Sequence, residues 1–202
     1  GLVGEDGATH HGVFDLAYLR CIPNMIIYSP MNEIDLRNIL YTAQLGLNHP
    51  IAIRYPRGRG EILDWKKPFE KIEIGKAKLL KKGSRIAILS NGFIGTNVIP
   101  ALAEIKNPHD FAHYDFSFVK PLDENLLHEI FKTFENIITL ENGTIKGGFG
   151  SSIIEFASTN GYLIPIKTLG IPDEFIEQGT VEELQKYSKI DPKSLKNTFE
   201  SY

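Results

Sequence analysis

Hydrophobic and polar positions follow two different periods along the first quarter of the chain. Residues 13–21 place apolar side chains at helical spacing, and the apolar run at residues 25–28 is typical of a buried strand. Residues 31–46 predict an amphipathic helix, with Leu40 among the side chains expected to face inward. A second short strand is predicted at residues 50–55. Helices that alternate with apolar strands indicate a parallel α/β sheet.

The same alternation starts again after residue 72 and continues to the end of the chain. Residues 56–72 hold two prolines, two glycines and many charges without a period, so we interpret them as a linker. We expect residues 1–55 to be the end of one α/β domain, and residues 73–202 to be a complete α/β domain with about four parallel strands. Strands are predicted at residues 84–92, 111–119, 136–143 and 165–172, and helices at residues 94–106, 123–133, from 147 on, and twice after Thr180.

Composition and charge exclude several classes of protein. The formal net charge is −3, and no basic stripe is present, so nucleic-acid binding is not expected. No run of about 18 apolar residues occurs, so we expect no membrane span. The single cysteine, Cys21, permits no internal disulfide and is expected to be a small buried side chain. These features predict a cytoplasmic protein.

Two adjacent histidines stand in the segment GEDGATHHGVFDL, at residues 4–16. A metal site is disfavoured, because neighbouring residues in a loop seldom face one ion and no third ligand lies at a suitable spacing. In a second interpretation one histidine is exposed and the other caps a helix. In a third, Asp6 and a histidine contact a hydroxylated substrate at the edge of a sheet, where a neutral imidazole can transfer protons near pH 7.

Three arginines follow the strand predicted at residues 50–55. Arg54, Arg57 and Arg59 occur in RYPRGRG. The planar guanidinium group matches phosphate, often through two parallel hydrogen bonds. The alternative is a solvated loop with ordinary charge pairs, and the sequence pattern leaves both open.

A glycine-rich segment, ENGTIKGGFGSS, begins at Glu141. It lacks the spacing of known phosphate-binding loops. Glycines before a helix also permit close packing of that helix on a sheet, and this interpretation is favoured here.

Taken together, the segments GEDGATHHGVFDLAYLRCIPNM, RYPRG, FVKPLDE, GGFGSS and GIPDEFIEQGT resemble the 1-deoxy-D-xylulose-5-phosphate synthases, a branch of the transketolase-like enzymes. The resemblance runs from residue 1 to about residue 183. It implies the end of a pyrimidine-binding domain of the transketolase type, followed by a transketolase C-terminal domain. This chain would then form roughly the last third of a longer, dimeric protein.

The resemblance also implies an activity. Enzymes of this family are transferases that join pyruvate to glyceraldehyde 3-phosphate with release of CO₂, in isoprenoid and thiamine biosynthesis. They use thiamine diphosphate and Mg²⁺, which regions upstream of this chain would bind. The chain by itself is therefore expected to be inactive and to supply no metal ligands.

The resemblance assigns roles to few residues. His10 matches a position near the reacting carbon and is the candidate for proton transfer. Asp6 matches a position near the hydroxyl of the acceptor aldehyde, and Arg57 matches a residue that holds its phosphate. Arg54 is a second candidate for substrate binding. His11 stands where relatives often have glutamine, and no role is assigned to it.

Two other functions stay open at this point. The chain could be a dimerisation module without catalytic residues. It could also be part of the β subunit of an E1-type 2-oxo acid dehydrogenase, which passes its acyl group to a lipoyl domain. The arginines of RYPRG favour a phosphorylated acceptor over the second alternative.

Overall fold

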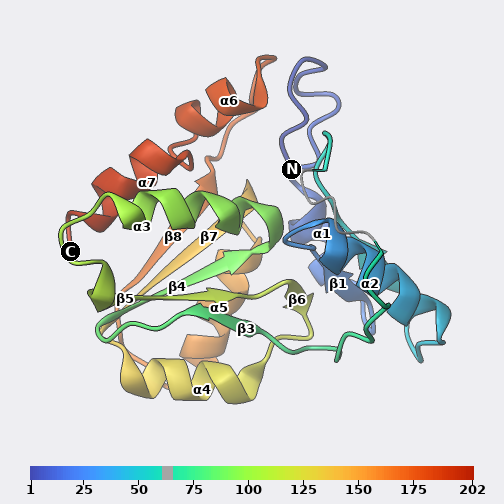
Figure 1. The fold of residues 1–202 in the computed structure, drawn as a ribbon, viewed down its shortest axis with the longest axis horizontal. Coiled ribbons are helices and arrows are strands. Elements are labelled where there is room, and N and C mark those ends of the chain that lie inside the picture. Colours follow the sequence, from blue (N-terminus) through green and yellow to red (C-terminus); the bar gives the residue numbers. More distant parts are fainter. Residues whose placement is uncertain (61–65) are drawn as a thin grey trace.

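The strands form two sheets in the computed structural model, which describes residues 1–60 and 66–202 (Figure 1). The smaller sheet has the order β2-β1-β6, with β1 and β2 parallel and β6 antiparallel. The larger has the order β3-β5-β4-β7-β8, with β3 antiparallel to four parallel strands. These findings confirm the α/β class. The strands are β1 (Ile26–Tyr28), β2 (Ile51–Ile53), β3 (Lys78–Lys81), β4 (Ile86–Asn91), β5 (Phe111–Asp115), β6 (Phe118–Lys120), β7 (Asn136–Thr144) and β8 (Ile166–Ile171).

Side chains cap the first turn of α2, α4, α6 and α7. Asn32 accepts a hydrogen bond from the amide of Asp35, and Asp123 accepts one from the amide of Leu126. The helices are α1 (Asp15–Arg20), α2 (Glu33–Gln44), α3 (Val98–Ala103), α4 (Glu124–Thr133), α5 (Phe149–Thr159), α6 (Val181–Tyr187) and α7 (Pro192–Phe199), with 3₁₀ turns η1 (Gly92–Asn97) and η2 (Pro108–Asp110).

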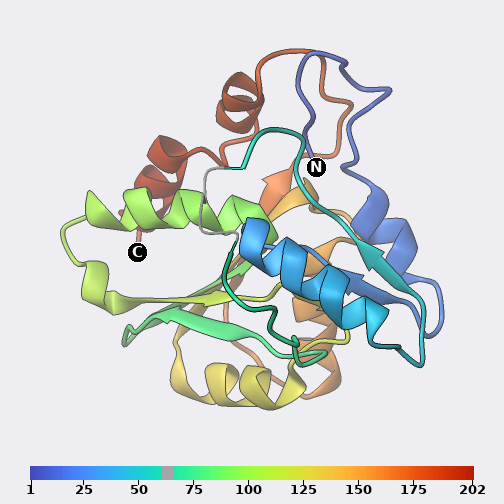
Figure 2. The same ribbon diagram turned by 45° about the vertical axis from the view of Figure 1, so that its right-hand side comes forward.

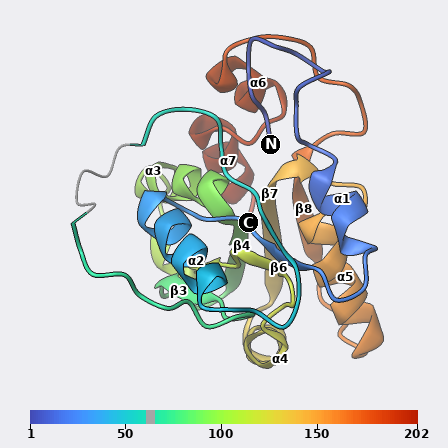
Figure 3. The same cartoon turned by 90° about the vertical axis from the view of Figure 1, so that its right-hand side faces the viewer.

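Helices cover both faces of the larger sheet, with α3 and α7 on one face and α4 and α5 on the other (Figures 1 and 3). Alternate residues of β4 serve the two faces. Ile86 and Ile88 join the core under α3 and α7, whereas Ala87 and Leu89 join the core under α4 and α5. Burial on both faces explains why these parallel strands are apolar runs without alternation.

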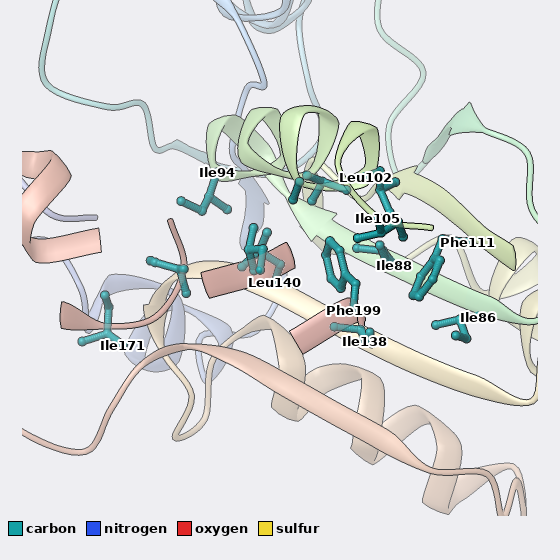
Figure 4. Close-up of a cluster of buried hydrophobic side chains, with 14 of the residues drawn as sticks. Ile86, Ile88, Ile94, Leu102, Ile105, Phe111, Ile138, Leu140, Ile171 and Phe199 are labelled. Atoms are coloured by element: carbon teal, nitrogen blue, oxygen red, sulfur yellow. The ribbon is translucent and has the colours of Figure 1, made fainter. Parts of the chain in front are cut away.

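The core under α3 and α7 is built from branched aliphatic side chains and two phenylalanines (Figure 4). Ile88 and Ile138 are fully buried, and Phe199 of α7 stacks at a tilt on Phe111, with ring centroids 5.5 Å apart. Burying one such side chain contributes about 1.5–3 kcal/mol. Leu2 and Val13, from the start of the chain, belong to the same core and so attach that segment to the larger sheet.

The prediction of one strand at residues 111–119 is wrong. The segment is divided into β5 and β6, and the two strands belong to different sheets. Phe118 pairs with Tyr28 of β1, and their rings meet edge to face with centroids 4.6 Å apart. The apolar pattern is continuous because both halves are buried, although their partners differ.

Three further expectations differ from the structure. Leu40 is 47 % exposed, because Asn38, Ile39 and Thr42 supply the buried face of α2. Cys21 is exposed. The residues predicted as helix from 94 to 106 divide into η1 and the shorter α3.

The predicted linker carries no helix or strand at residues 56–60 and 66–72, and residues 61–65 lie outside the described residues. Strand β6 follows this segment in sequence and nevertheless joins the smaller sheet. The division of the chain at residues 55 and 73 therefore stays a prediction.

Candidate functional site

The two adjacent histidines lie in an extended loop, residues 1–14, which we call the histidine loop (Figure 2). Two tight turns shape it: the amide of Gly7 donates to the carbonyl of Gly4 at 3.1 Å, and the amide of His10 donates to the carbonyl of Gly7 at 3.0 Å. Gly4 and Gly7 have φ angles of +97° and +68°, which side chains rarely permit. The glycines at these positions therefore define the path of the loop.

Asp6 and Arg57 meet although 51 residues separate them. The Nη1 of Arg57 forms an ion pair with the Oδ2 of Asp6, and both side chains remain about half exposed. The segment after β2 runs beside the histidine loop, which makes this contact possible (Figures 1 and 2). The structure thus brings together two of the residues predicted to bind substrate.

His10 follows Asp6 by four residues in the same loop and is exposed. Its Nδ1 lies 3.0 Å from the Oγ1 of Thr9, so Nε2 is the ring atom left for an external group. An exposed imidazole can exchange protons with a group that approaches it from solvent.

Arg54 lies beneath the histidine loop, unlike Arg57. Its Nε is 2.6 Å from the Oδ2 of Asp15, and its Nη2 donates to the carbonyl oxygens of Gly12, at 3.1 Å, and of Asn142. Its side chain is only 11 % exposed. This geometry favours a structural role for Arg54 over contact with a substrate.

Asn142, at the end of β7, was not singled out from the sequence. Its side-chain Oδ1 accepts a hydrogen bond from the amide of Leu2 at 3.1 Å. Two residues further, the amide of Thr144 donates to the carbonyl of Val13 at 2.8 Å. Both ends of the histidine loop are therefore attached to β7, and the sequence signal was the polar side chain of Asn142 near the end of the strand predicted at residues 136–143.

His11 is buried, in contrast to its neighbour His10. Its Nδ1 lies 3.1 Å from the amide nitrogen of Val3, and its Nε2 lies 3.3 Å from the carbonyl oxygen of Glu177. The ring therefore connects the histidine loop to the segment between β8 and α6.

The position of Glu141 explains why glycines occur in the segment ENGTIKGGFGSS. Its carboxylate accepts hydrogen bonds from the amides of Phe149 and Gly150, both at 2.8 Å, at the start of α5. A Cβ at Gly148 would overlap this carboxylate, and one at Gly150 would lie 2.6 Å from the Oγ1 of Thr139. The glycines thus serve close packing, and a protein carboxylate occupies the place where a phosphate loop would hold its ligand.

Burial raises the pKa of Glu141 to about 7. The hydrogen bonds from Gly150 and Phe149 and the positive charge of Arg54 act in the opposite direction without cancelling it. The carboxyl group can therefore change its protonation near neutral pH beneath the histidine loop.

Arg57 and Arg59 line a cavity of about 280 Å³ at the first turn of α2. Tyr55 and Phe93 contribute its aromatic walls. A second cavity, of about 680 Å³, lies between β3 and α3 and includes none of Asp6, His10 and Arg57 among its lining residues. Of these two cavities, the smaller one adjoins the candidate site.

The described residues include no cluster of three or more His, Cys, Asp or Glu side chains suited to a metal ion. Across residues 1–60 and 66–202, no helix is both long enough and apolar enough to cross a membrane.

Two family models match the chain. The model of the transketolase pyrimidine binding domain matches residues 1–61, and the model of the transketolase C-terminal domain matches residues 75–195. Together they cover both sheets and the histidine loop.

Curated relatives share about half of the residues. The 1-deoxy-D-xylulose-5-phosphate synthase of Parabacteroides distasonis is 54 % identical over 96 % of this chain, and that of Vibrio parahaemolyticus is 43 % identical over 100 % of it. The matched region makes up 31 % and 32 % of these relatives. The chain thus spans about a third of their length.

Solved structures share the fold. A structure described as "Split gene transketolase, inactive beta4 tetramer" superposes with a TM-score of 0.85 at 25 % identity, over 98 % of this chain and 64 % of that one. Transketolase from Leishmania mexicana superposes with a TM-score of 0.72 at 16 % identity, over 97 % of this chain and 28 % of that one. The chain belongs to the transketolase family, and the resemblance of its motifs to the 1-deoxy-D-xylulose-5-phosphate synthases is confirmed.

Proposed function

We propose that this chain is the C-terminal portion of a thiamine diphosphate-dependent synthase. The whole enzyme condenses pyruvate with glyceraldehyde 3-phosphate to give 1-deoxy-D-xylulose 5-phosphate and CO₂, the first step of the non-mevalonate isoprenoid pathway. The observation that carries the proposal is the contact between Asp6 and Arg57, which joins the loop of His10 to a cation beside a cavity. The names of the relatives support the same reaction.

Arg57 serves as the anchor for the phosphate of the aldehyde. Its ion pair with Asp6 is about half exposed, and such pairs contribute only about 0–1 kcal/mol, so a phosphate can replace the carboxylate at low cost. Two parallel hydrogen bonds from a guanidinium to a phosphate are stronger and more directional. Asp6, released from Arg57, is then free to accept a hydrogen bond from a hydroxyl of the same aldehyde.

His10 acts at the other end of the aldehyde. Binding of the phosphate far from the reacting carbon orients the carbonyl group and converts binding energy into rate. The Nε2–H of His10 then donates a proton to the aldehyde oxygen as that oxygen gains negative charge. The ring of His10 is exposed, so a group that enters from solvent can approach it.

Thiamine diphosphate, when bound, supplies the stabilised carbanion. The described residues offer no cluster of ligands for Mg²⁺, so we assign the metal ion and the diphosphate to the upstream part of the enzyme. The residues of this chain position the acceptor. On this assignment residues 1–202 alone are inactive.

We assign the whole enzyme to the cytoplasm as a homodimer. The neighbour described as an inactive β4 tetramer comes from a split-gene transketolase, and this chain covers 64 % of it. Its description supports the expectation that such a segment can associate with copies of itself without activity. A chain that only mediates dimerisation would associate without contributing residues to catalysis. The activity test below therefore also tests this alternative.

The test is product formation by the full-length enzyme from pyruvate, glyceraldehyde 3-phosphate, thiamine diphosphate and Mg²⁺. We expect His10→Ala to lower kcat by about a hundredfold or more. Arg57→Ala should chiefly raise KM for the aldehyde, and Arg85→Ala, at an exposed arginine that precedes β4 and does not line this cavity, is the matched control. Absence of the deoxysugar phosphate, or equal effects of the two arginine variants, contradicts the proposal.

A further inference from the structure

The buried ring of His11 lies between two segments that 166 residues separate. One is the histidine loop, and the other is residues 172–180, the connection from β8 to α6. We propose that His11 is a positioning residue, whose neutral imidazole fastens the histidine loop to this connection and thereby sets the place of His10 and Asp6. The inference rests on the proposed function for its effect on catalysis.

The two contacts of the ring specify one protonation state. The amide of Val3 can only donate a hydrogen bond, so the Nδ1 of His11 must accept it without a proton. The carbonyl of Glu177 can only accept, so Nε2 must carry the proton. The ring is therefore held as the neutral tautomer with hydrogen on Nε2.

The backbones of the histidine loop and the connection approach each other closely at two glycines. A Cβ at Gly4 would lie 3.2 Å from the carbonyl oxygen of Gly179, and a Cβ at Gly7 would lie 3.4 Å from the Cβ of Gln178. The ring of Phe14 meets that of Phe175 edge to face, with centroids 5.9 Å apart. The histidine loop and the connection are thus in close contact along several residues, and His11 supplies the polar link between them.

His10 depends on this link because its own side chain is not held by packing. The ring of His10 is exposed and contacts only its neighbour Thr9 among the described hydrogen bonds. The amides of His10 and His11 both donate to the carbonyl of Gly7, so the two residues share one turn of backbone. Contacts that hold His11 in place therefore also hold the Cα atom of His10 in place.

Glutamine can replace both contacts of His11. Its amide presents an acceptor oxygen and a donor nitrogen on one planar group, which are the two functions that the neutral ring performs here. Alanine presents neither. Comparison of His11→Gln with His11→Ala therefore separates the effect of the two hydrogen bonds from the effect of replacing the imidazole ring.

The experiment uses the full-length enzyme with His11→Ala, His11→Gln and, as the matched control, the exposed His49→Ala. We expect His11→Ala to lower kcat/KM for the phosphorylated aldehyde by about a hundredfold, as displacement of a reacting group by about 1 Å does. His11→Gln should stay within about threefold of the wild type. His49→Ala should be unchanged.

Amide hydrogen exchange of the same proteins gives a readout that does not depend on activity. In the wild type and in His11→Gln, the amide of Val3 should be protected, and in His11→Ala its exchange should accelerate by at least about tenfold. If the wild type forms no product, the proposed function fails, and exchange still decides whether His11 fastens the loop. Unchanged exchange in His11→Ala, or a His11→Gln variant as impaired as His11→Ala in both measurements, overturns the inference.

Discussion

Replacement of Arg54 by methionine removes the positive charge beneath the histidine loop and keeps a side chain of similar length. The guanidinium of Arg54 pairs with Asp15 at 2.6 Å and donates to the backbone of Gly12 and Asn142. Methionine can fill the space and can replace none of these hydrogen bonds. The perturbation therefore tests whether Arg54 is structural, as the geometry favours, or binds substrate, as its place after β2 suggests in sequence.

The expected magnitude follows from burial. The side chains of Arg54 and Asp15 are 11 % and 17 % exposed. Removing one partner of a buried pair costs about 3–5 kcal/mol, and the partial exposure of this pair places it at the lower end, about 3 kcal/mol. That free energy corresponds to roughly a hundredfold change in an equilibrium constant.

Amide hydrogen exchange of the full-length enzyme measures this loss locally. We expect Arg54→Met to accelerate exchange at Gly12 and Thr144, the amides that close the base of the loop, by about a hundredfold. In the Arg54→Met background, a further Asp15→Leu change should cost much less than it does alone, because the pair is already broken. Unchanged exchange together with a raised KM for the aldehyde would show that Arg54 binds substrate and would refute the structural role.

Three further variants test the framework around the site. The pKa of Glu141 is raised from 4.5 to about 7, so its contribution to the free energy of unfolding is full below pH 4.5 and is lost as the pH rises through 7. The loss amounts to about 3 kcal/mol. Glu141→Gln should remove most of this pH dependence from the free energy of unfolding measured between pH 5 and 8. Gly148→Ala should destabilise the enzyme by about 1–3 kcal/mol in thermal unfolding, since its Cβ overlaps Glu141, and a neutral effect would contradict the packing role. Ile88→Ala, at a fully buried position, should cost about 2–5 kcal/mol in urea, and a smaller loss would mean that the core collapses around the cavity.

The fold could be predicted largely because periodicity reports burial. The apolar runs of β4 and β7 are buried on both faces, so they could be recognised without knowledge of their neighbours. Periodicity does not say which strand is the partner. For this reason residues 111–119 were predicted as one strand, although Phe118 pairs with Tyr28 in the smaller sheet.

The candidate site was predictable in its residue types and less so in its contacts. Asp6, His10 and Arg57 could be proposed from local motifs and from the resemblance. Asp6 contacts Arg57 across 51 positions of sequence, and His11 contacts Glu177 across 166 positions. Local sequence patterns do not predict contacts between residues so far apart in sequence. Arg54 and Arg57 look equivalent in sequence, and only burial separates them.

The central claim is that Arg57 recognises the phosphate of the acceptor, and it is tested most directly by removing the side chain and the phosphate in turn. Full-length wild type and Arg57→Ala are assayed with glyceraldehyde 3-phosphate and with unphosphorylated glyceraldehyde. We predict that the variant loses about a hundredfold in kcat/KM with the phosphorylated aldehyde and less than about threefold with glyceraldehyde. An equal loss with both aldehydes would contradict the account, because Arg57 would then act without the phosphate.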